Sequence, residues 1–349
     1  MVAALPWVIR NCLGPMLCHV SGNGGEHSPC AQHEPLRGAE LSAKVISKTL
    51  TAAMEEILDA CVSRVERIVL LKGISISSQY YPLPHLRPMR DIDFLVEEKD
   101  LAVTEKILAG LGYQRRSKNP ESFYRNMHHS MPFFHPRNNV WVEVHTDIFP
   151  PGSPLIQGAV FSRENLVANY VAGSFNGREV CRLSAEMQLL YTIGHWGFEY
   201  KTLGGCVALF DVVYLLQNEH QLDWDRILGW LDTRSITALV LLCLGYLQAN
   251  QIIEIEGDII HKLKSRMPAS YAYSLAILHS IIEKHYLAGV PYGRLMTVNN
   301  VAIQWRTLLQ DRSPLLNLLS IPLNILFPPK AEKRFNPVFQ FQRIKNIFK

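Results

Sequence analysis

The chain has 349 residues, of which 48% are apolar and 19% are charged, and its formal net charge is +4. This composition predicts a globular protein of one large or two smaller domains, and the small positive charge suits phosphate-bearing substrates without requiring nucleic acid. Seven cysteines at scattered spacings exclude a disulfide framework, and no apolar run is long enough to span a bilayer, so we expect a cytoplasmic protein without a transmembrane segment.

The first 39 residues predict a poorly defined lead-in, either amphipathic or disordered. Residues 20–38 are rich in glycine, proline and serine, which indicates a loop or a disordered join. Apolar residues then recur at helical spacing from Leu41 to Val65. We therefore expect an amphipathic helix that packs under the first strand of the following domain.

A short apolar strand, residues 68–71, runs directly into Lys72 and Gly73. A helix-like stretch and a loop with several prolines then lead to Arg87 and Arg90. Gly73 permits a ligand to approach the backbone closely, and Lys72 supplies a point charge at the end of the strand. The two arginines are suited to bind phosphate groups, with a solvated surface charge as the alternative for each basic residue.

Two carboxylates mark the next predicted strand, residues 91–96. Because side chains alternate along a strand, Asp91 and Asp93 share one face, while Ile92 and Phe94 point toward a core. Neighbouring carboxylates repel each other and lose hydration, so something must compensate them. Hard oxygen ligands suit Mg²⁺, and we therefore predict a divalent metal site, with a solvated strand end as the alternative.

A helix over residues 101–111 and then a hairpin follow this strand. The hairpin arms are residues 130–134 and 140–148. In the second arm, valines at alternate positions form one face, and the opposite face carries Trp141, Glu143, His145 and Asp147. Both acidic strands thus have an apolar face as well. We expect a sheet that helices cover on one side and that is open to substrate on the other.

Prolines at residues 150, 151 and 154 indicate a domain boundary. A small hairpin with Asn176-Gly177 at its tip leads to Ser184, where a helical signal begins that continues to about residue 310. The last residues are basic and aromatic. We therefore expect four segments, a lead-in over 1–39, a catalytic domain over 40–150, a mostly helical domain over 151–312 and a basic tail over 313–349.

These motifs together resemble the uncharacterised nucleotidyltransferase family within the polymerase-beta-like superfamily. The likeness rests on Lys72-Gly73, Tyr80-Tyr81-Pro82, Arg87-Pro88 and Asp91-Ile92-Asp93 in this order. It continues through Leu111-Gly112-Tyr113 and Val142–His145, and more loosely through Leu183–His195, Asp211 and Asp223-Trp224. It spans most of residues 40–250, and Asp-Ile-Asp is specific in this context.

The resemblance implies an α+β fold, with a polymerase-beta-like mixed sheet that has helices on one face and is followed by a mostly helical domain. It also implies a metal centre in which Asp91 and Asp93 hold Mg²⁺ or Mn²⁺ and the nucleotide phosphates. Glu143 is then the third carboxylate, which binds a second metal ion and helps to deprotonate the acceptor; an exposed, ion-paired strand residue is the alternative.

Other residues have assigned places in this prediction. Lys72, Gly73, Arg87 and Arg90 are expected on the phosphate side. His145 either orients Glu143 or contacts the acceptor, and a structural histidine is an equal alternative. His195 and Asp211, on successive predicted helices, are expected to form a buried pair that braces the helical domain.

The implied reaction moves a nucleoside monophosphate from a nucleoside triphosphate to an acceptor hydroxyl, with release of pyrophosphate. The acceptor is a small molecule or a protein. The alternative is a catalytically silent member of the same fold that binds a nucleotide or a partner protein. Polymerisation of nucleic acid is disfavoured, because the sequence has no extended basic stripe or aromatic stacking platform outside the tail, and no stable nucleic-acid partner is expected.

Overall fold

The protein was analysed as a computed structural model, in which the described residues are 5–21, 32–125, 127–151, 153–199, 205–269, 271–295, 297 and 300. The chain divides into two compact units. The first contains residues 1–199 and 204–230, and the second contains 200–203 and 231–349. Residue 150, where the sequence predicts a boundary, lies inside the first unit, because the sheet of this unit continues beyond it.

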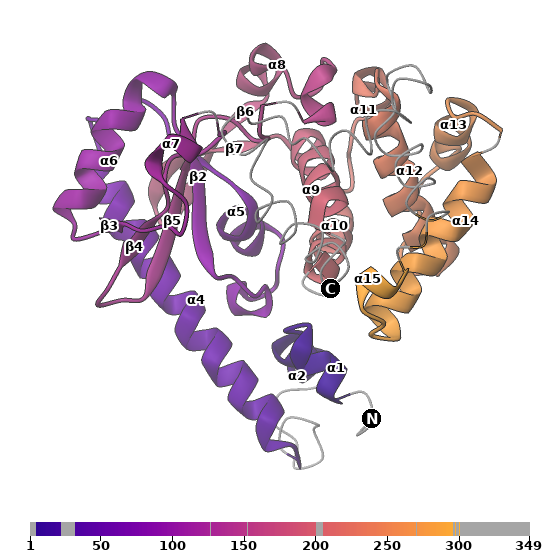
Figure 1. Cartoon of the computed structure of the whole chain (residues 1–349), viewed down its shortest axis with the longest axis horizontal. Helices are drawn as coiled ribbons and strands as arrows, with labels where there is room; N and C mark the ends of the chain where they lie inside the picture. The colour runs from indigo at the N-terminus through magenta and orange to yellow at the C-terminus, as the bar shows by residue number, and fades with distance from the viewer. Residues whose placement is uncertain are drawn as a thin grey trace, which may run out of the picture. The chain divides into compact units, whose positions relative to one another are not determined.

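A mixed seven-stranded sheet organises the first unit (Figure 1). Its order is β3-β4-β5-β2-β1-β7-β6. The strands in chain order are β1 (Val69–Leu70), β2 (Asp91–Leu95), β3 (Gln114–Arg115), β4 (Phe133–His135), β5 (Val140–His145), β6 (Tyr170–Phe175) and β7 (Arg178–Leu183). The prediction of an α+β fold with a mixed sheet is confirmed, and the predicted hairpin at Asn176-Gly177 supplies the last two strands of this sheet.

The centre of the sheet brings the two acidic strands together. β2 runs parallel to β5, with Asp93 opposite Glu143 and Asp91 opposite Trp141. β1 pairs antiparallel with β2 and parallel with β7. Because partners in a parallel ladder project to the same side, the side chains of Asp93 and Glu143 belong to one face of the sheet.

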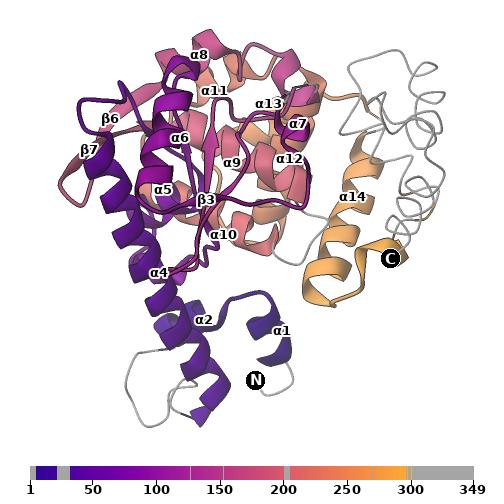
Figure 2. The same ribbon diagram turned by 60° about the vertical axis from the view of Figure 1, so that its left-hand side comes forward.

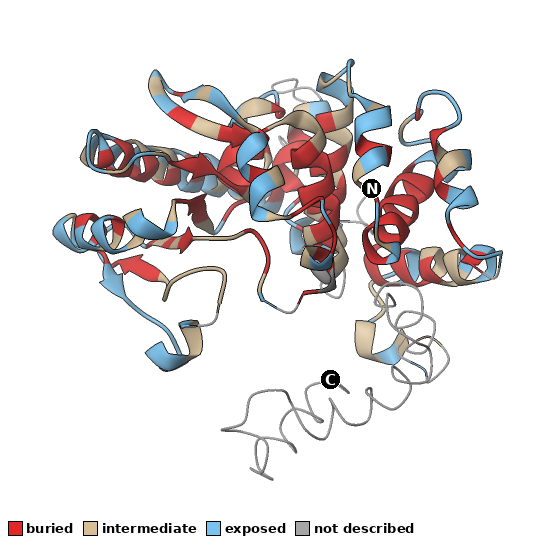
Figure 3. Ribbon diagram, turned by 90° about the horizontal axis from the view of Figure 1, so that it is seen from above, coloured by how far each residue is buried: buried red, intermediate tan, exposed pale blue. Residues whose placement is uncertain are grey.

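The opposite face forms the main hydrophobic core against α4 (Glu34–Cys61) and α6 (Leu101–Gly110), which lie side by side in Figures 1 and 2. The valines of β5 pack there, as predicted from their alternation, together with Ile92 and Phe94, which are fully buried. In Figure 3 the central strands are mostly buried, whereas the helices around them carry both buried and exposed residues. The core thus fixes which way the acidic side chains point.

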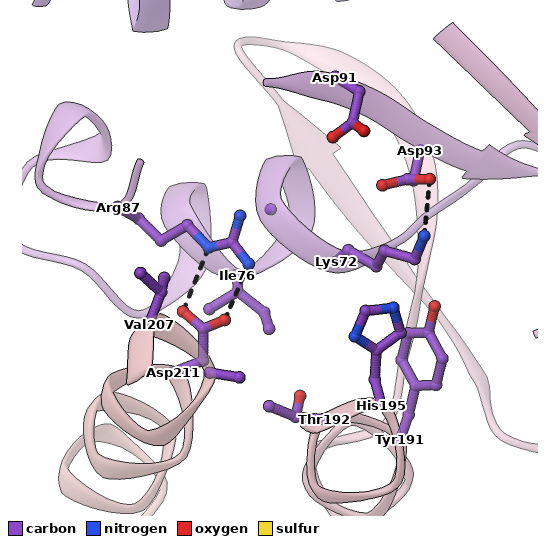
Figure 4. Close-up of a pocket in the computed structure, with 12 residues that line it drawn as sticks. Lys72, Ile76, Arg87, Asp91, Asp93, Tyr191, Thr192, His195, Val207 and Asp211 are labelled. Carbon is purple, nitrogen blue, oxygen red and sulfur yellow. Dashed lines mark hydrogen bonds and ion pairs between the residues drawn. The ribbon is translucent and has the colours of Figure 1, made fainter. Parts of the chain in front are cut away.

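Helices also lie over the acidic face, which the sequence predicts to be open. They are α5 (Lys72–Gln79), α9 (Ala185–Glu199) and α10 (Cys206–Asn218) (Figures 1 and 4). On this face Asp93 is 3% exposed and Leu95 is 1% exposed. The acidic residues therefore lie beside a cavity that helices partly enclose.

Two short helices precede α4, where the sequence predicts a poorly defined segment. α1 (Leu5–Arg10) and α2 (Gly14–Val20) lie beside the first turns of α4 (Figure 2). Leu13, Met16 and Cys18 are buried in this contact region. Cys18 is disulfide-bonded, although the cysteine spacings predict no disulfide framework, whereas Cys12, Cys61, Cys181, Cys206 and Cys243 are free.

The second unit is helical in its described part, as predicted for this region. Its central helix, α12 (Arg234–Ala249), is buried from Ser235 to Leu247. Around it lie α13 (Ile259–Ser265), α14 (Tyr271–Ile282), a π-helical turn η6 (Glu283–Leu287) and α15 (Tyr292–Leu295). Among the residues that the structure describes, no helix combines the length and hydropathy that a membrane crossing requires. The predicted basic tail lies outside the described residues.

The remaining elements are short and belong to the first unit. They are η2 (Pro84–Leu86), η3 (Glu98–Asp100), α7 (Glu121–Tyr124), η4 (Pro154–Gln157), α8 (Arg163–Ala168) and α11 (Trp224–Trp230). The first of these, η2, follows α5 in the proline-rich loop. It leads directly to Arg87 and then to β2, so the loop carries a basic side chain to the acidic face.

Candidate active site

A small cavity lies between the acidic face of the sheet and the helices α5, α9 and α10. Its volume is about 140 Å³, and Asp91 and Asp93 project into it from β2 (Figure 4). Lys72 and Gly73 border it from the first turn of α5. The structure thus brings the predicted strand carboxylates and the predicted Lys-Gly pair to one place.

Asp93 is compensated by two side chains of the protein itself. Its Oδ1 atom lies 2.9 Å from Lys72 Nζ and accepts a hydrogen bond from His145 Nε2 at 2.8 Å. Burial alone would raise the pKa of this carboxyl, but the nearby ammonium of Lys72 and the His145 hydrogen bond hold it well below the usual range. Asp93 is therefore ionised at neutral pH, although the sequence argument assigned its compensation to a metal ion.

The other two carboxyl groups, those of Asp91 and Glu143, have raised pKa values. Burial and then the charge of Asp93 raise the pKa of Asp91 to about 7 and that of Glu143 to about 7. Both residues remain half-buried, with 25% of the Glu143 side chain exposed. Near neutral pH each of them exchanges a proton readily, which is the property expected of a general base or of a ligand that awaits a cation.

A divalent cation fits this donor set. One ligand atom each of Asp93, Glu143 and His145 lie within 4.8 Å of one another, and carboxylate oxygens are the donors that Mg²⁺ and Mn²⁺ prefer. Asp91 lines the same cavity without belonging to this group. His145 fits less well, because its second ring nitrogen, Nδ1, is buried with no hydrogen-bond partner among the described residues.

Metal-bound imidazoles almost always donate their second N–H to an acceptor. The tautomer that suits His145 here instead carries the proton on Nε2 and donates it to Asp93. The structure therefore favours the two carboxylates as ligands and His145 as the residue that orients Asp93. The rings of His128 and His129 surround His145, with centroids 5.2 and 5.4 Å from its own. The sequence analysis assigned these two histidines no part in the site.

Arg87 lines the cavity and forms an ion pair with Asp211 that the sequence did not predict. Its Nη2 and Nε atoms donate to Asp211 at 2.9 and 3.3 Å, and the Tyr81 hydroxyl donates to the same carboxylate at 2.8 Å. The sequence predicts a pair between Asp211 and His195. The structure gives Asp211 these partners from the loop before β2, and His195 lines the same cavity (Figure 4).

Gly73 makes room for the Arg87 guanidinium. A Cβ atom at this position would lie 2.4 Å from Arg87 Nη1 and 2.9 Å from Met89 Cγ. Both distances are shorter than real carbon contacts, so any other residue would displace the arginine. The predicted role of Gly73, close approach to its backbone, is thus filled by a side chain of the protein.

This packing gives a stability prediction for Gly73→Ala. We expect the substitution to lower the free energy of unfolding by about 1–3 kcal/mol, because the added methyl group overpacks the contact with Arg87 and Met89. Denaturant titration measures this change. The matched control is Gly229→Ala in α11, where a Cβ meets nothing within 4 Å. Equal stabilities of the two variants would contradict the packing argument.

The helical wall of the cavity was not predicted as part of the site. Tyr191, Thr192 and His195 project from α9, and Val207 and Ala208 from α10. Burial, followed by the charge of Lys72, lowers the pKa of His195 to about 3, so its imidazole is neutral. The only sequence signal for this wall was the looser family likeness that reaches His195.

Arg90 lies elsewhere. It is exposed, and it lines a separate apolar cavity together with Pro88, Met89 and residues of α2 and α4. Asp147 is half-buried, and one of its carboxylate oxygens, Oδ1, accepts a hydrogen bond from the Ile148 amide at 2.7 Å. Of the predicted phosphate-side residues, the cavity therefore contains Lys72, Gly73 and Arg87.

The raised pKa of Glu143 predicts a pH-dependent difference in stability. Between its ordinary value of 4.5 and about 7, the folded protein holds the Glu143 proton more tightly than the unfolded chain, so this residue's contribution to stability falls as pH rises. Glu143→Gln removes that loss. In the presence of a chelator, we expect the melting temperature of the variant to rise relative to that of the wild type as the pH is increased from 5 to 8. A difference that is constant with pH would contradict the raised pKa.

Comparison with known proteins identifies the family. Residues 3–250 match the family of uncharacterised nucleotidyltransferases. The chain belongs to this family. The match includes every residue of the cavity described above, among them the α9 and α10 wall. No curated protein and no solved structure matches the chain.

Proposed function

We propose that this nucleotidyltransferase moves a nucleoside monophosphate from a nucleoside triphosphate to an acceptor hydroxyl and releases pyrophosphate, with Mg²⁺ or Mn²⁺ as cofactor. The observation that carries the proposal is the register of β2 and β5, which sets Asp93 directly opposite Glu143 beside Asp91. Lys72 borders the same cavity. Asp91, Asp93 and Lys72 line one cavity, Glu143 lies opposite Asp93 on the neighbouring strand, and such a set of groups suits phosphoryl chemistry.

The residues that would hold the cation are Asp93 and Glu143, with Asp91 beside them. A cation bound there stabilises negative charge on the phosphate oxygens and lowers the pKa of the attacking hydroxyl. His145 fixes the orientation of Asp93 through its Nε2 hydrogen bond. Glu143, which lies opposite Asp93, is the carboxylate that would accept the proton of the acceptor hydroxyl.

The phosphate end of the substrate is assigned to the two basic side chains that line the cavity. Lys72 supplies the ammonium, and Arg87, held by Asp211, supplies a guanidinium that borders the same space. The neutral His195 and Thr192 on α9 form an uncharged wall beside them. We assign this wall to the acceptor, which is a hydroxyl of a small molecule or of a protein side chain.

One observation favours a second candidate, a member that binds nucleotide without transferring it. Lys72 already neutralises Asp93 within the protein, as a charge pair in an inactive site would. Such a protein would keep its affinity for a nucleoside triphosphate but would release no pyrophosphate. Binding and turnover measured on the same preparation therefore separate the two candidates.

The test is incubation of the protein with each nucleoside triphosphate, Mg²⁺ or Mn²⁺, and a cell extract that supplies acceptors. The proposal predicts release of pyrophosphate with at least one nucleotide, and a chelator should abolish it. Nucleotide binding without pyrophosphate release under any of these conditions would support the second candidate and contradict the proposal.

A further inference from the structure

Lys72 occupies a position that the proposed cation needs. Its Nζ atom lies 2.9 Å from Asp93 Oδ1, and His145 Nε2 lies 2.8 Å from the same oxygen. Asp93 projects from β2 and is one of the three residues of the candidate metal group. An ammonium group at hydrogen-bond distance from a metal-binding carboxylate repels a second cation and takes up one of its ligand atoms.

The backbone of Lys72 is held in an unfavourable conformation. Its φ angle is +44°, in the left-handed region that L residues other than glycine, asparagine and aspartate rarely adopt. Such a conformation is unfavourable and persists where surrounding contacts impose it, commonly at functional sites. Here Lys72 begins α5, lines the cavity and holds its ammonium against Asp93 of β2.

The part of the cavity that these side chains enclose is small. It holds about 140 Å³, whereas sites for ligands of drug size enclose roughly 300–1,000 Å³. A triphosphate that enters it therefore comes directly against the side chains of Lys72 and Arg87. Arg87 is held by two hydrogen bonds to Asp211, whereas among the described contacts Lys72 is held by a single carboxylate.

We propose that Lys72 is an internal cation that occupies Asp93 in the free protein and moves from Asp93 to the triphosphate when a divalent cation binds. The inference rests on the proposed function and adds a coupling to it. The cation must displace the ammonium and so binds weakly by itself, and the released ammonium then favours the triphosphate. Metal ion and nucleotide consequently bind with positive cooperativity, because each favours the same position of Lys72.

The test compares Lys72→Met with the wild type by calorimetric titration with Mn²⁺ alone, in the absence of nucleotide. We expect the variant to bind Mn²⁺ at least tenfold more tightly, because Asp93 no longer holds an ammonium group. Its affinity for a non-hydrolysable nucleoside triphosphate analogue should fall by about tenfold. Lys99→Met is the matched control, since the Lys99 side chain is 65% exposed and pairs with Glu66 at the surface; it should change neither affinity.

Two further measurements, one on Lys72→Gln and one on the wild type, test the inference if Lys72→Met does not fold. Gln keeps a polar contact to Asp93 without the charge and should shift Mn²⁺ affinity in the same direction. In the wild type, Mn²⁺ should increase acylation of the Lys72 amine by an amine-reactive reagent several-fold relative to Lys99, as read by peptide mass spectrometry.

Two results would overturn the inference. The first is that the folded variants bind Mn²⁺ no more tightly than the wild type does. The second is that Mn²⁺ leaves the acylation of Lys72 unchanged. Either result leaves the proposed function intact if the wild type still releases pyrophosphate. Absence of pyrophosphate release, in contrast, contradicts the proposed function and not the displacement of Lys72.

Discussion

Asp93→Asn should reduce nucleotidyl transfer by about 10³-fold or more. Asparagine keeps the shape of the side chain but loses the charge that a cation requires. The substitution also leaves the Lys72 ammonium without its carboxylate in a largely buried position, since only 19% of its side chain is exposed. We therefore expect reduced stability as well, of the order of 3–5 kcal/mol for a broken buried pair.

The measurement is pyrophosphate release at a temperature where circular dichroism shows the variant to be folded. Asp225→Asn is a suitable control, because Asp225 is exposed in the first turn of α11. The double variant Asp93→Asn with Lys72→Met removes the unpaired charge, so it should recover stability without recovering activity. Turnover of folded Asp93→Asn at the wild-type rate would refute the role of this carboxylate.

Glu143→Gln should lower the rate of the chemical step by about 10²–10⁴-fold while nucleotide affinity changes little. The reason is that Gln cannot accept the acceptor proton and is a weaker cation ligand than a carboxylate. The side chain lies opposite Asp93 and remains 25% exposed, so the substitution is expected to leave the fold intact. Single-turnover kinetics and nucleotide titration separate the two effects.

Asp147 provides the comparison for this prediction. It lies two residues beyond the end of β5, and the sequence predicts it on the same face as Glu143. Its carboxylate accepts a hydrogen bond from the Ile148 amide, and it does not belong to the group that Asp93, Glu143 and His145 form. Asp147→Asn should retain most of the activity. The assignment of Glu143 is wrong if the two variants exchange these phenotypes.

Local patterns predicted how each strand presents its side chains. Alternation along residues 91–96 and 140–148 placed Asp91, Asp93 and Glu143 away from the core, and the structure agrees, because period-two alternation follows from strand geometry alone. The register that sets Asp93 opposite Glu143 joins segments about 50 residues apart and depends on how the whole sheet assembles. The sequence suggested a shared face but carried no information on this pairing.

The cavity wall shows where local reasoning ended. Arg87 and Asp211 are 124 positions apart, and each alone resembles an ordinary charged residue. Their pairing depends on how α10 packs against the loop before β2, and on the absence of a Cβ at Gly73. Likewise, hydrophobic periodicity identified α9 as a helix but did not show that this helix covers the acidic face.

The central claim is that the α-phosphorus of a nucleoside triphosphate is transferred at this cavity. The most direct test is to supply the wild type with triphosphate labelled either at the α- or at the γ-phosphate, together with Mg²⁺ and an extract of acceptors. The account predicts that α-label becomes attached to an acceptor while γ-label leaves as pyrophosphate. Transfer of γ-label to the acceptor, or retention of both labels in intact nucleotide, would contradict it.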